Sequence, residues 1–340
     1  MTAGPVIAAS PATRLARLVA DAAARVELDL TDRVVLTEAA TGAYVVTPVL
    51  AALAGAARVH AWTRASRHGS VAEVHAQTEA LAAQFGVADR ITITDHRSLA
   101  DVAAADVVTN SGHVRPIDAT LVAAMKPGAV VPLMFEAWEI QAGRFDLDLE
   151  RLRQRGVAVA GTNERHPSVD VFSYLGLMAV KALIDAGIPT YGTHLGVLCD
   201  NPFEDYLVRG LRGAGARSVT AAASVAGLSP AAALDALVVS LRPTGGSVLS
   251  PATVEEIATR WPGLPVVQYW GDLDRAALDA AGLPYWPMIP PSPGHMAVLP
   301  SAVGPDPIVR LQAGGLKVAE VLLRPPALRR PQDLEFLDEL

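Results

Sequence analysis

The densest group of polar side chains in this sequence of 340 residues is the segment 162–167, Thr-Asn-Glu-Arg-His-Pro. A histidine titrates near neutral pH, which makes His166 a candidate for proton transfer. Glu164 would orient the imidazole ring, and Arg165 would bind a substrate carboxylate through its guanidinium group. An exposed polar loop is the alternative interpretation, and the sequence leaves both open.

A second candidate for acid–base chemistry follows the apolar segment 129–134, where the chain reads Glu-Ala-Trp-Glu. Glu136 would act as a base or hold a substrate amine, and Trp138 would contact the substrate. A solvated loop with a packing tryptophan is the alternative.

A phosphate-binding turn is suggested by Thr41, Gly42 and Ala43, which follow the first apolar segment at 33–37. Small residues at the N-terminus of a helix let an anion approach the free backbone amides. We therefore expect these residues to contact a cofactor pyrophosphate. A tight strand-to-helix connection without any ligand would look the same.

The loop after the second apolar segment carries Arg64, Ser66 and Arg67 and no acidic residue. NAD-specific sites usually place Asp or Glu here for the ribose 2′-hydroxyl, whereas arginines suit a 2′-phosphate. The sequence therefore favours NADP over NAD as the cofactor. A solvated basic loop is the alternative.

Further cofactor contacts are expected after the segment 106–109, because ligands of α/β sheets collect at the carboxyl ends of strands. The candidates are Asn110, Ser111, Gly112 and His113.

In the second half of the chain, Asn201 and Arg242 are candidates for substrate binding, and His295 is a candidate for a second acid or base. Each follows an expected strand. Asn201 also suits a helix-capping turn within Asp-Asn-Pro.

The elements that must position these residues alternate between short apolar strands and amphipathic helices, which predicts parallel sheets with helices on both faces. We expect strands at 33–37, 58–62, 91–94, 106–109, 129–134, 157–160, 194–198, 218–222, 236–240, 266–269 and 285–288. We expect helices at 11–24, 44–54, 71–85, 117–125, 149–155, 169–186, 204–213, 251–261, 275–281 and 305–323.

The fold class is therefore α/β, with two Rossmann-like doubly wound domains and a cleft between them. We expect an N-terminal helix and arm at 1–30, a nucleotide-binding domain at 31–190, a Rossmann- or flavodoxin-like substrate domain at 191–325 and a tail at 326–340. The helix at 169–186 ends at Gly-Ile-Pro, which places the boundary near 187–193. The halves also share a strand-and-helix pattern that indicates an internal repeat or equivalent topology.

Two stretches carry a resemblance to a known family. The first runs from Asp-Ala-Leu-Val-Val-Ser at 235–240 to Tyr-Trp-Pro-Met at 285–288, and the second reads ADVVTNSGHVRPIDATLVAAMKPGAVV at 105–131. They resemble the substrate and cofactor domains of the D-2-hydroxyacid dehydrogenases of the formate/glycerate dehydrogenase type. The resemblance implies a two-domain, dinucleotide-dependent oxidoreductase.

The chain departs from that family in three ways. The nucleotide-like half comes first, whereas the family inserts its cofactor domain within the substrate domain. The glycine-rich turn is reduced to one glycine, Gly42, and the place of the family's catalytic arginine is taken by 134–138, Met-Phe-Glu-Ala-Trp. The family's catalytic residues therefore do not transfer to this chain.

Composition excludes several other classes. The formal net charge is −7 and no basic stripe occurs, so nucleic acid is not an expected partner. No long apolar run or signal peptide is recognisable, and the one cysteine, Cys199, fits a reducing cytoplasm. The absence of zinc motifs argues against a metal.

These observations predict an NAD(P)-dependent oxidoreductase that acts on a small polar, carboxylated molecule. A non-redox transferase with a nucleotide-linked donor and a binding module without cofactor remain alternatives. A homodimer through the long apolar helices is an open possibility.

Overall fold

A computed structural model describes residues 12–141, 147–229 and 233–340. Its contacts divide the chain into two compact units. Unit 1 comprises residues 1–171 and 304–340, and unit 2 comprises residues 172–303. Unit 2 is thus inserted within unit 1.

Unit 1 is built on a seven-stranded sheet in the order β12-β6-β5-β4-β1-β2-β3. Its strands are β1 (Val34–Glu38), β2 (Arg58–Trp62), β3 (Ile91–Thr94), β4 (Val107–Val108), β5 (Val130–Pro132), β6 (Ala158–Thr162) and β12 (Leu337–Asp338). All are parallel except β12, which pairs antiparallel with β6. The parallel strands have the order 3-2-1-4-5-6 of dinucleotide-binding domains, so the strand order reverses between β1 and β4.

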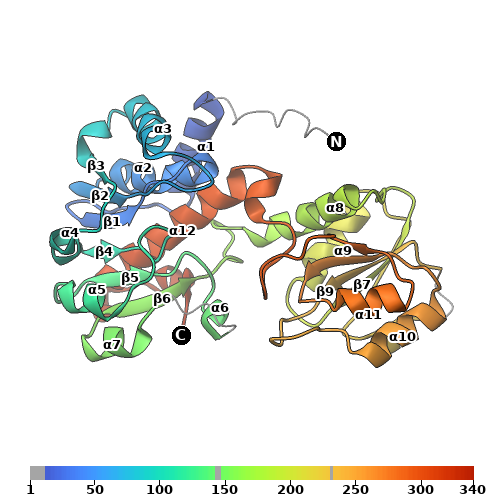
Figure 1. The fold of residues 1–340 in the computed structure, drawn as a ribbon. Coiled ribbons are helices and arrows are strands. Elements are labelled where there is room, and N and C mark those ends of the chain that lie inside the picture. The colour runs from blue at the N-terminus through green and yellow to red at the C-terminus, as the bar shows by residue number, and fades with distance from the viewer. Residues whose placement is uncertain (1–11, 142–146, 230–232) are drawn as a thin grey trace. The chain divides into compact units, whose positions relative to one another are not determined.

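Helices cover both faces of this sheet (Figure 1). One face packs against α1 (Ala12–Arg25), α2 (Val46–Leu53), α3 (Val71–Gln84) and α12 (Asp306–Leu323). The other packs against α4 (Leu99–Ala104), α5 (Ala119–Ala124) and α7 (Leu149–Gln154). Short helices complete the unit: η1 (Gly42–Val45), η2 (Ala88–Arg90), α6 (Trp138–Gln141), η6 (Pro326–Leu328) and α13 (Pro331–Leu334).

Local sequence fixes several helix starts. Ser70 and Glu73 form a capping box at the start of α3, and the Asp118 carboxylate accepts two backbone amides at the start of α5. The loops between strand and helix therefore have defined ends at the sheet edge where ligands bind.

Unit 2 is built on a five-stranded parallel sheet in the order β11-β10-β9-β7-β8. Its strands are β7 (His194–Cys199), β8 (Ser218–Ala222), β9 (Ala236–Ser240), β10 (Val266–Trp270) and β11 (Tyr285–Trp286). Its helices are η3 (Phe172–Tyr174), α8 (Leu175–Asp185), α9 (Glu204–Gly213), η4 (Val225–Gly227), α10 (Pro251–Arg260), α11 (Arg275–Ala280) and η5 (Pro300–Val303).

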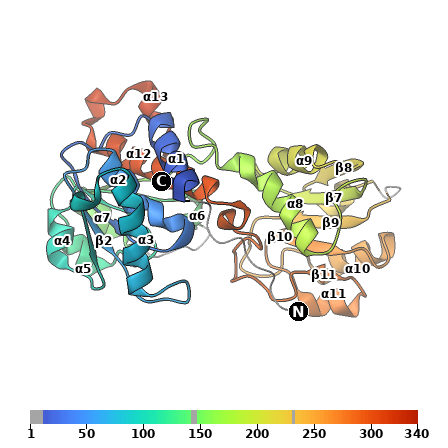
Figure 2. The ribbon, with the colours of Figure 1, turned by 90° about the horizontal axis from the view of Figure 1, so that it is seen from above.

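The strand order of unit 2, read from β7, is the flavodoxin-like 2-1-3-4-5. Figure 2 shows α8 and α9 along one face of its sheet and α10 and α11 along the other. The predicted fold class, two doubly wound α/β domains, is confirmed.

The two sheets share a common core of five strands. β2-β1-β4-β5-β6 of unit 1 has the same order as β8-β7-β9-β10-β11 of unit 2, and unit 1 adds β3 and β12 at its edges. The segments whose similarity predicted a repeat therefore occupy equivalent strands.

The division into units differs from the expected boundaries at 190 and 325. The helix after the last strand of each repeat packs into the other unit: α8 follows β6 but packs on α9 and β10, and α12 follows β11 but packs on β5, β6 and α2. The buried faces of these helices decide the division, which places the boundaries at 171/172 and 303/304. The expectation that the second half follows whole is corrected in the same way.

None of the helices described in the structure is long and apolar enough to cross a membrane.

Candidate functional site

The carboxyl edge of the unit 1 sheet is held together by side chains that follow β1, β4 and β5. Thr109 Oγ1 donates to Thr37 Oγ1 at 2.9 Å and lies 2.7 Å from Ser111 Oγ. Asn110 Oδ1 accepts the backbone amide of Met134 at 2.7 Å. All four polar side chains are buried, so Asn110 and Ser111, expected to contact a cofactor through their side chains, use them to fix the strand ends.

The turn after β1 has room for an anion. Gly42 has a φ of +67°, which favours glycine, and no atom lies within 4 Å of the place where a Cβ would be. Its backbone amide donates to Gln77 Oε1 at 3.0 Å in an exposed contact, which a phosphate oxygen can replace. Thr41 and Ala43 flank it, and no carboxylate lies within the turn itself. These features fit a phosphate group.

The loop after β2 lies against this turn. Thr41 Oγ1 donates to the backbone carbonyl of His68 at 2.9 Å, and Ser66 Oγ accepts the His68 amide at 3.1 Å. Arg64 and Arg67 are exposed, and Arg67 Nε donates to His68 Nε2 at 3.0 Å. The structure therefore brings the expected phosphate turn and the expected 2′-phosphate loop together.

A buried carboxylate that sequence analysis missed lies beside the turn. Glu38, the last residue of β1, is 6% exposed, and its Oε2 accepts the backbone amide of His113 at 3.0 Å. Burial raises the pKa of Glu38, while the backbone amides of His113 and Gly112 and the charge of Arg115 oppose this shift. The available signal was an acid at the end of an otherwise apolar strand, Val-Val-Leu-Thr-Glu.

Gly112 and His113 form the opposite side of this crevice, after β4. A Cβ on Gly112 would lie 2.5 Å from Glu38 Oε2, so only glycine leaves room for the carboxylate. His113 Nδ1 is buried without a hydrogen-bond partner. Burial, together with the charge of Arg64, lowers the pKa of His113, so its ring is neutral at pH 7.

A second buried carboxylate follows β5, as predicted. Glu136 is 4% exposed; its Oε2 accepts Trp138 Nε1 at 2.7 Å, and its Oε1 lies 3.6 Å from Arg165 Nε. Burial raises the pKa of Glu136, and Asp338 adds to the shift, while Trp138, Arg165 and the Glu164 amide oppose it. A carboxyl group with a raised pKa suits proton transfer near neutral pH.

His166 lies in a different environment from the one expected of a catalytic pair with Glu164. Its ring stacks on Phe336 with centroids 3.8 Å apart, Nδ1 accepts the Ser168 amide at 3.1 Å, and Nε2 lies 3.9 Å from Glu335 Oε2. Burial lowers the pKa of His166, and Glu335 opposes the shift. Both ring nitrogens thus face the chain's own groups, which indicates a structural role.

The C-terminal segment supports the loops after β5 and β6. The Asn163 amide donates to the Phe336 carbonyl at 3.0 Å as β12 pairs with β6, and Asp338 Oδ2 accepts the Ala137 amide at 2.6 Å. The backbone next to Glu136 is therefore held by a residue two hundred positions away in sequence, which no local pattern reveals.

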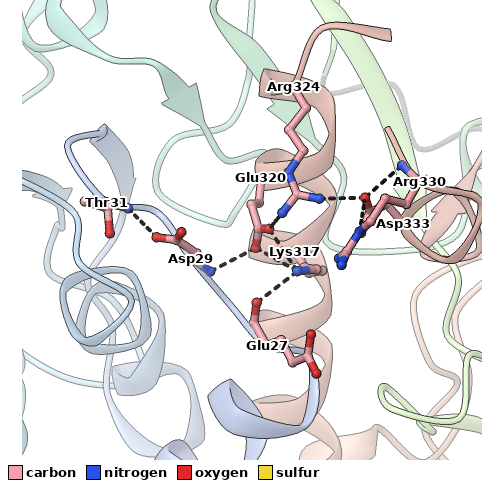
Figure 3. Close-up of polar contacts among 8 residues, drawn as sticks. All are labelled: Glu27, Asp29, Thr31, Lys317, Glu320, Arg324, Arg330 and Asp333. Atoms are coloured by element: carbon pink, nitrogen blue, oxygen red, sulfur yellow. Dashed lines mark hydrogen bonds and ion pairs between the residues drawn. The ribbon is translucent and has the colours of Figure 1, made fainter. Parts of the chain in front are cut away.

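A network of buried charges anchors this segment to α12 (Figure 3). Lys317 Nζ donates to both carboxylate oxygens of Glu320 at 2.9 Å and to the Glu27 carbonyl at 2.9 Å. Arg324 joins Glu320 to Asp333, whose Oδ2 lies 2.6 Å from Arg324 Nη1. The hydrogen bond from Arg330 holds the pKa of Asp333 well below its usual range.

The candidates of unit 2 lie at the carboxyl edge of its own sheet. Asn201 Nδ2 donates to the Ser240 carbonyl at 2.7 Å and Asn201 Oδ1 accepts the Phe203 amide, so its side chain ties β7 to β9. Arg242 is exposed, and its backbone amide donates to Asp200 Oδ1 at 2.9 Å. His295 Nδ1 lies 3.1 Å from the Pro293 carbonyl. Asn201 thus has the turn-forming role that its Asp-Asn-Pro context also suggested.

Solved structures with this fold include one of the subunits of dipicolinate synthase. The protein from Bacillus halodurans matches with a TM-score of 0.54 and 11% identity over 87% of this chain and 100% of that chain. The protein from Bacillus subtilis matches with a TM-score of 0.53 and 9% identity over 84% and 95%. An NAD-dependent formate dehydrogenase from Staphylococcus aureus, solved with NAD, has a TM-score of 0.49 at 10% identity over 77% and 94%.

The predicted resemblance to D-2-hydroxyacid dehydrogenase-like proteins is thereby confirmed at the level of fold. No protein-family model matches the sequence, and no curated protein matches it. In the described parts of the chain, no group of three His, Cys, Asp or Glu side chains could hold a metal ion.

Proposed function

We propose that the chain is an NAD(P)-dependent oxidoreductase acting on a small polar, carboxylated substrate, and that unit 1 binds the cofactor. The observation that carries the proposal is the crevice at the β1/β4 reversal of unit 1. It combines the 3-2-1-4-5-6 strand order with an open glycine turn and an adjacent arginine loop.

The corresponding turn of unit 2 suits phosphate less well. Asp200, Glu204 and Asp205 place three carboxylates around the first turn of α9, and Pro202 removes a backbone amide. Negative side chains near a helix N-terminus occupy the positive end of its dipole and repel a phosphate. The two equivalent turns of the repeat thus differ in the charge that they can accept.

In this proposal Thr41, Gly42 and Ala43 hold the pyrophosphate, and Arg64 with Arg67 holds the 2′-phosphate. The nicotinamide, when bound, supplies or accepts the hydride. Glu136, with its raised pKa, takes or gives the proton, and Arg165 beside it attracts the substrate carboxylate. Trp138 orients the Glu136 carboxylate through its indole N–H.

The proposal is tested by thermal denaturation with NADPH, NADH and a panel of nucleotide sugars. A ligand present at about 100 times its Kd stabilises the protein by about 2.7 kcal/mol. We expect NADPH to stabilise most, and a mixture of NADPH with short 2-oxo acids to lose reduced-nicotinamide absorbance. Stabilisation by neither dinucleotide would contradict the proposal, and stabilisation by a nucleotide sugar alone would favour a transferase.

Replacing Arg64 and Arg67 by alanine tests the preference for NADP. Loss of charge-assisted hydrogen bonds to a 2′-phosphate is expected to weaken NADPH binding about tenfold or more. NADH binding should change by less than about twofold, because NADH has a hydroxyl at this position. Titration calorimetry measures both constants.

The matched control for this experiment is Arg58→Ala, since Arg58 is an exposed arginine at the opposite end of β2. Its variant should bind both dinucleotides like the wild type. Equal weakening of NADPH and NADH in the Arg64/Arg67 variant would argue against the 2′-phosphate role.

A further inference from the structure

The crevice at the β1/β4 reversal contains its own anion. Glu38 Oε2 accepts the His113 amide at 3.0 Å, and the Gly112 amide also stabilises the carboxylate. Successive backbone amides of this kind bind anions in many proteins. Here Glu38 already satisfies them, so this part of the crevice is closed to a phosphate or carboxylate of a ligand.

The crevice also retains hydrogen-bonding capacity for a ligand. His113 Nδ1 is buried without a partner, which is rare for a polar atom inside a protein. Glu38 Oε2 is used by the backbone, whereas Oε1 is neither buried without a partner nor engaged by a described group. A carboxylate oxygen can only accept, so the group that it meets must donate.

From these two observations we infer that Glu38 and His113 bind an uncharged donor group of the ligand, a hydroxyl or a carboxamide, and keep phosphate out of this part of the crevice. The inference rests on the proposed function, in which the group belongs to the nicotinamide half of the dinucleotide. The phosphates then lie at the Gly42 turn and the Arg64–Arg67 loop, where no carboxylate competes. Glu38 thereby determines the orientation in which the dinucleotide binds.

The charge of Glu38 gives the experiment a sign that distinguishes the two occupants. Glu38→Gln keeps the size of the side chain, removes the negative charge and turns one accepting oxygen into a donor. A hydroxyl or carboxamide should then bind more weakly, because a charge-assisted hydrogen bond is lost. A phosphate at the same place should bind more tightly, because a like charge has been removed.

The measurement is titration calorimetry at pH 8 with three probes: NADPH, reduced nicotinamide mononucleotide and 2′,5′-ADP. For Glu38→Gln we expect an affinity loss of about tenfold or more for NADPH and the nicotinamide mononucleotide. The affinity for 2′,5′-ADP should stay within about twofold, because that half contacts the arginine loop. Asp95→Asn, an exposed carboxylate after β3 at the same sheet edge, is the matched control and should bind like the wild type.

His113→Phe provides a second variant that removes Nδ1 and keeps an aromatic ring. It should weaken the nicotinamide mononucleotide and leave 2′,5′-ADP unchanged. Tighter NADPH binding by Glu38→Gln, or unchanged binding by both variants, would overturn the inference while the proposed function stands. Failure of the wild type to bind NADPH or NADH at millimolar concentration would overturn both.

Discussion

Replacing Glu136 by glutamine is expected to reduce turnover about a hundredfold or more while raising the melting temperature at pH 8. Glu136 is buried after β5, and burial raises the pKa of its carboxyl group. Glutamine keeps the shape and can still accept the Trp138 indole N–H, but it cannot transfer a proton. A loss of function together with a gain of stability is typical of a buried functional group.

The sign of the stability effect follows from the direction of the pKa shift. Because the pKa of Glu136 is higher in the folded than in the unfolded state, the folded protein binds more protons between the two values. The stability contributed by this group is therefore present below the unfolded pKa and is lost as pH rises through the folded pKa. The stability gain of Glu136→Gln should be largest at pH 8 and vanish near pH 4.

The measurements are melting curves from pH 4 to pH 8 and the reduction rate of whichever 2-oxo acid the wild type reduces fastest. Glu139→Gln, in the same loop, is the matched control and should leave turnover unchanged. A Glu136→Gln variant with wild-type turnover, or one less stable than the wild type at pH 8, would contradict the assigned role.

The second large effect is expected at the buried charges beneath the C-terminal segment. Glu320→Leu should destabilise unit 1 by about 3–5 kcal/mol, because it leaves Lys317 buried without its carboxylate. The Asp29 amide, which donates to Glu320 Oε2 at 2.9 Å, also loses its partner (Figure 3). Native-state hydrogen exchange of the α12 amides measures this loss within unit 1.

The matched control is the double variant Lys317→Met/Glu320→Leu. Apolar residues of similar volume in place of a buried ion pair are often neutral or stabilising. The double variant should therefore recover most of the stability that Glu320→Leu loses. Exchange in the single variant within about 1 kcal/mol of wild type would show that Glu320 does not compensate the buried lysine.

Alternating apolar and amphipathic segments were sufficient to predict the strands of both shared cores and most helices. The strand β2 (Arg58–Trp62) lies where predicted, and β1 is shifted by one residue. The two-residue strand β12 and the short helix α6 were not predicted, because their conformation depends on pairing with β6 and on the turn after β5. Such short elements lack a period of their own.

The domain boundary was mislocated for a related physical reason. The helix α12 is apolar over most of its surface, so its sequence indicates burial but not the sheet against which it is buried. Its contacts with β5 and β6 assign it to unit 1.

The candidate site was predictable where it depends on position after a strand. Glu136, Thr41–Ala43 and Gly112–His113 all lie at the sheet edge as expected. Sequence alone did not reveal that Asn110 and Ser111 would fix strand ends or that His166 would pack under Phe336. It missed Glu38, because an acid at a strand end is ordinarily exposed, and only the glycine at 112 makes room for it.

The central claim, that unit 1 holds the dinucleotide, is tested most directly by hydrogen–deuterium exchange with and without saturating NADPH. The account predicts slower exchange of the amides at 41–45 and 111–113, and no change at 200–205 in the equivalent turn of unit 2. Protection at 200–205 with none at 41–45 and 111–113 would contradict it.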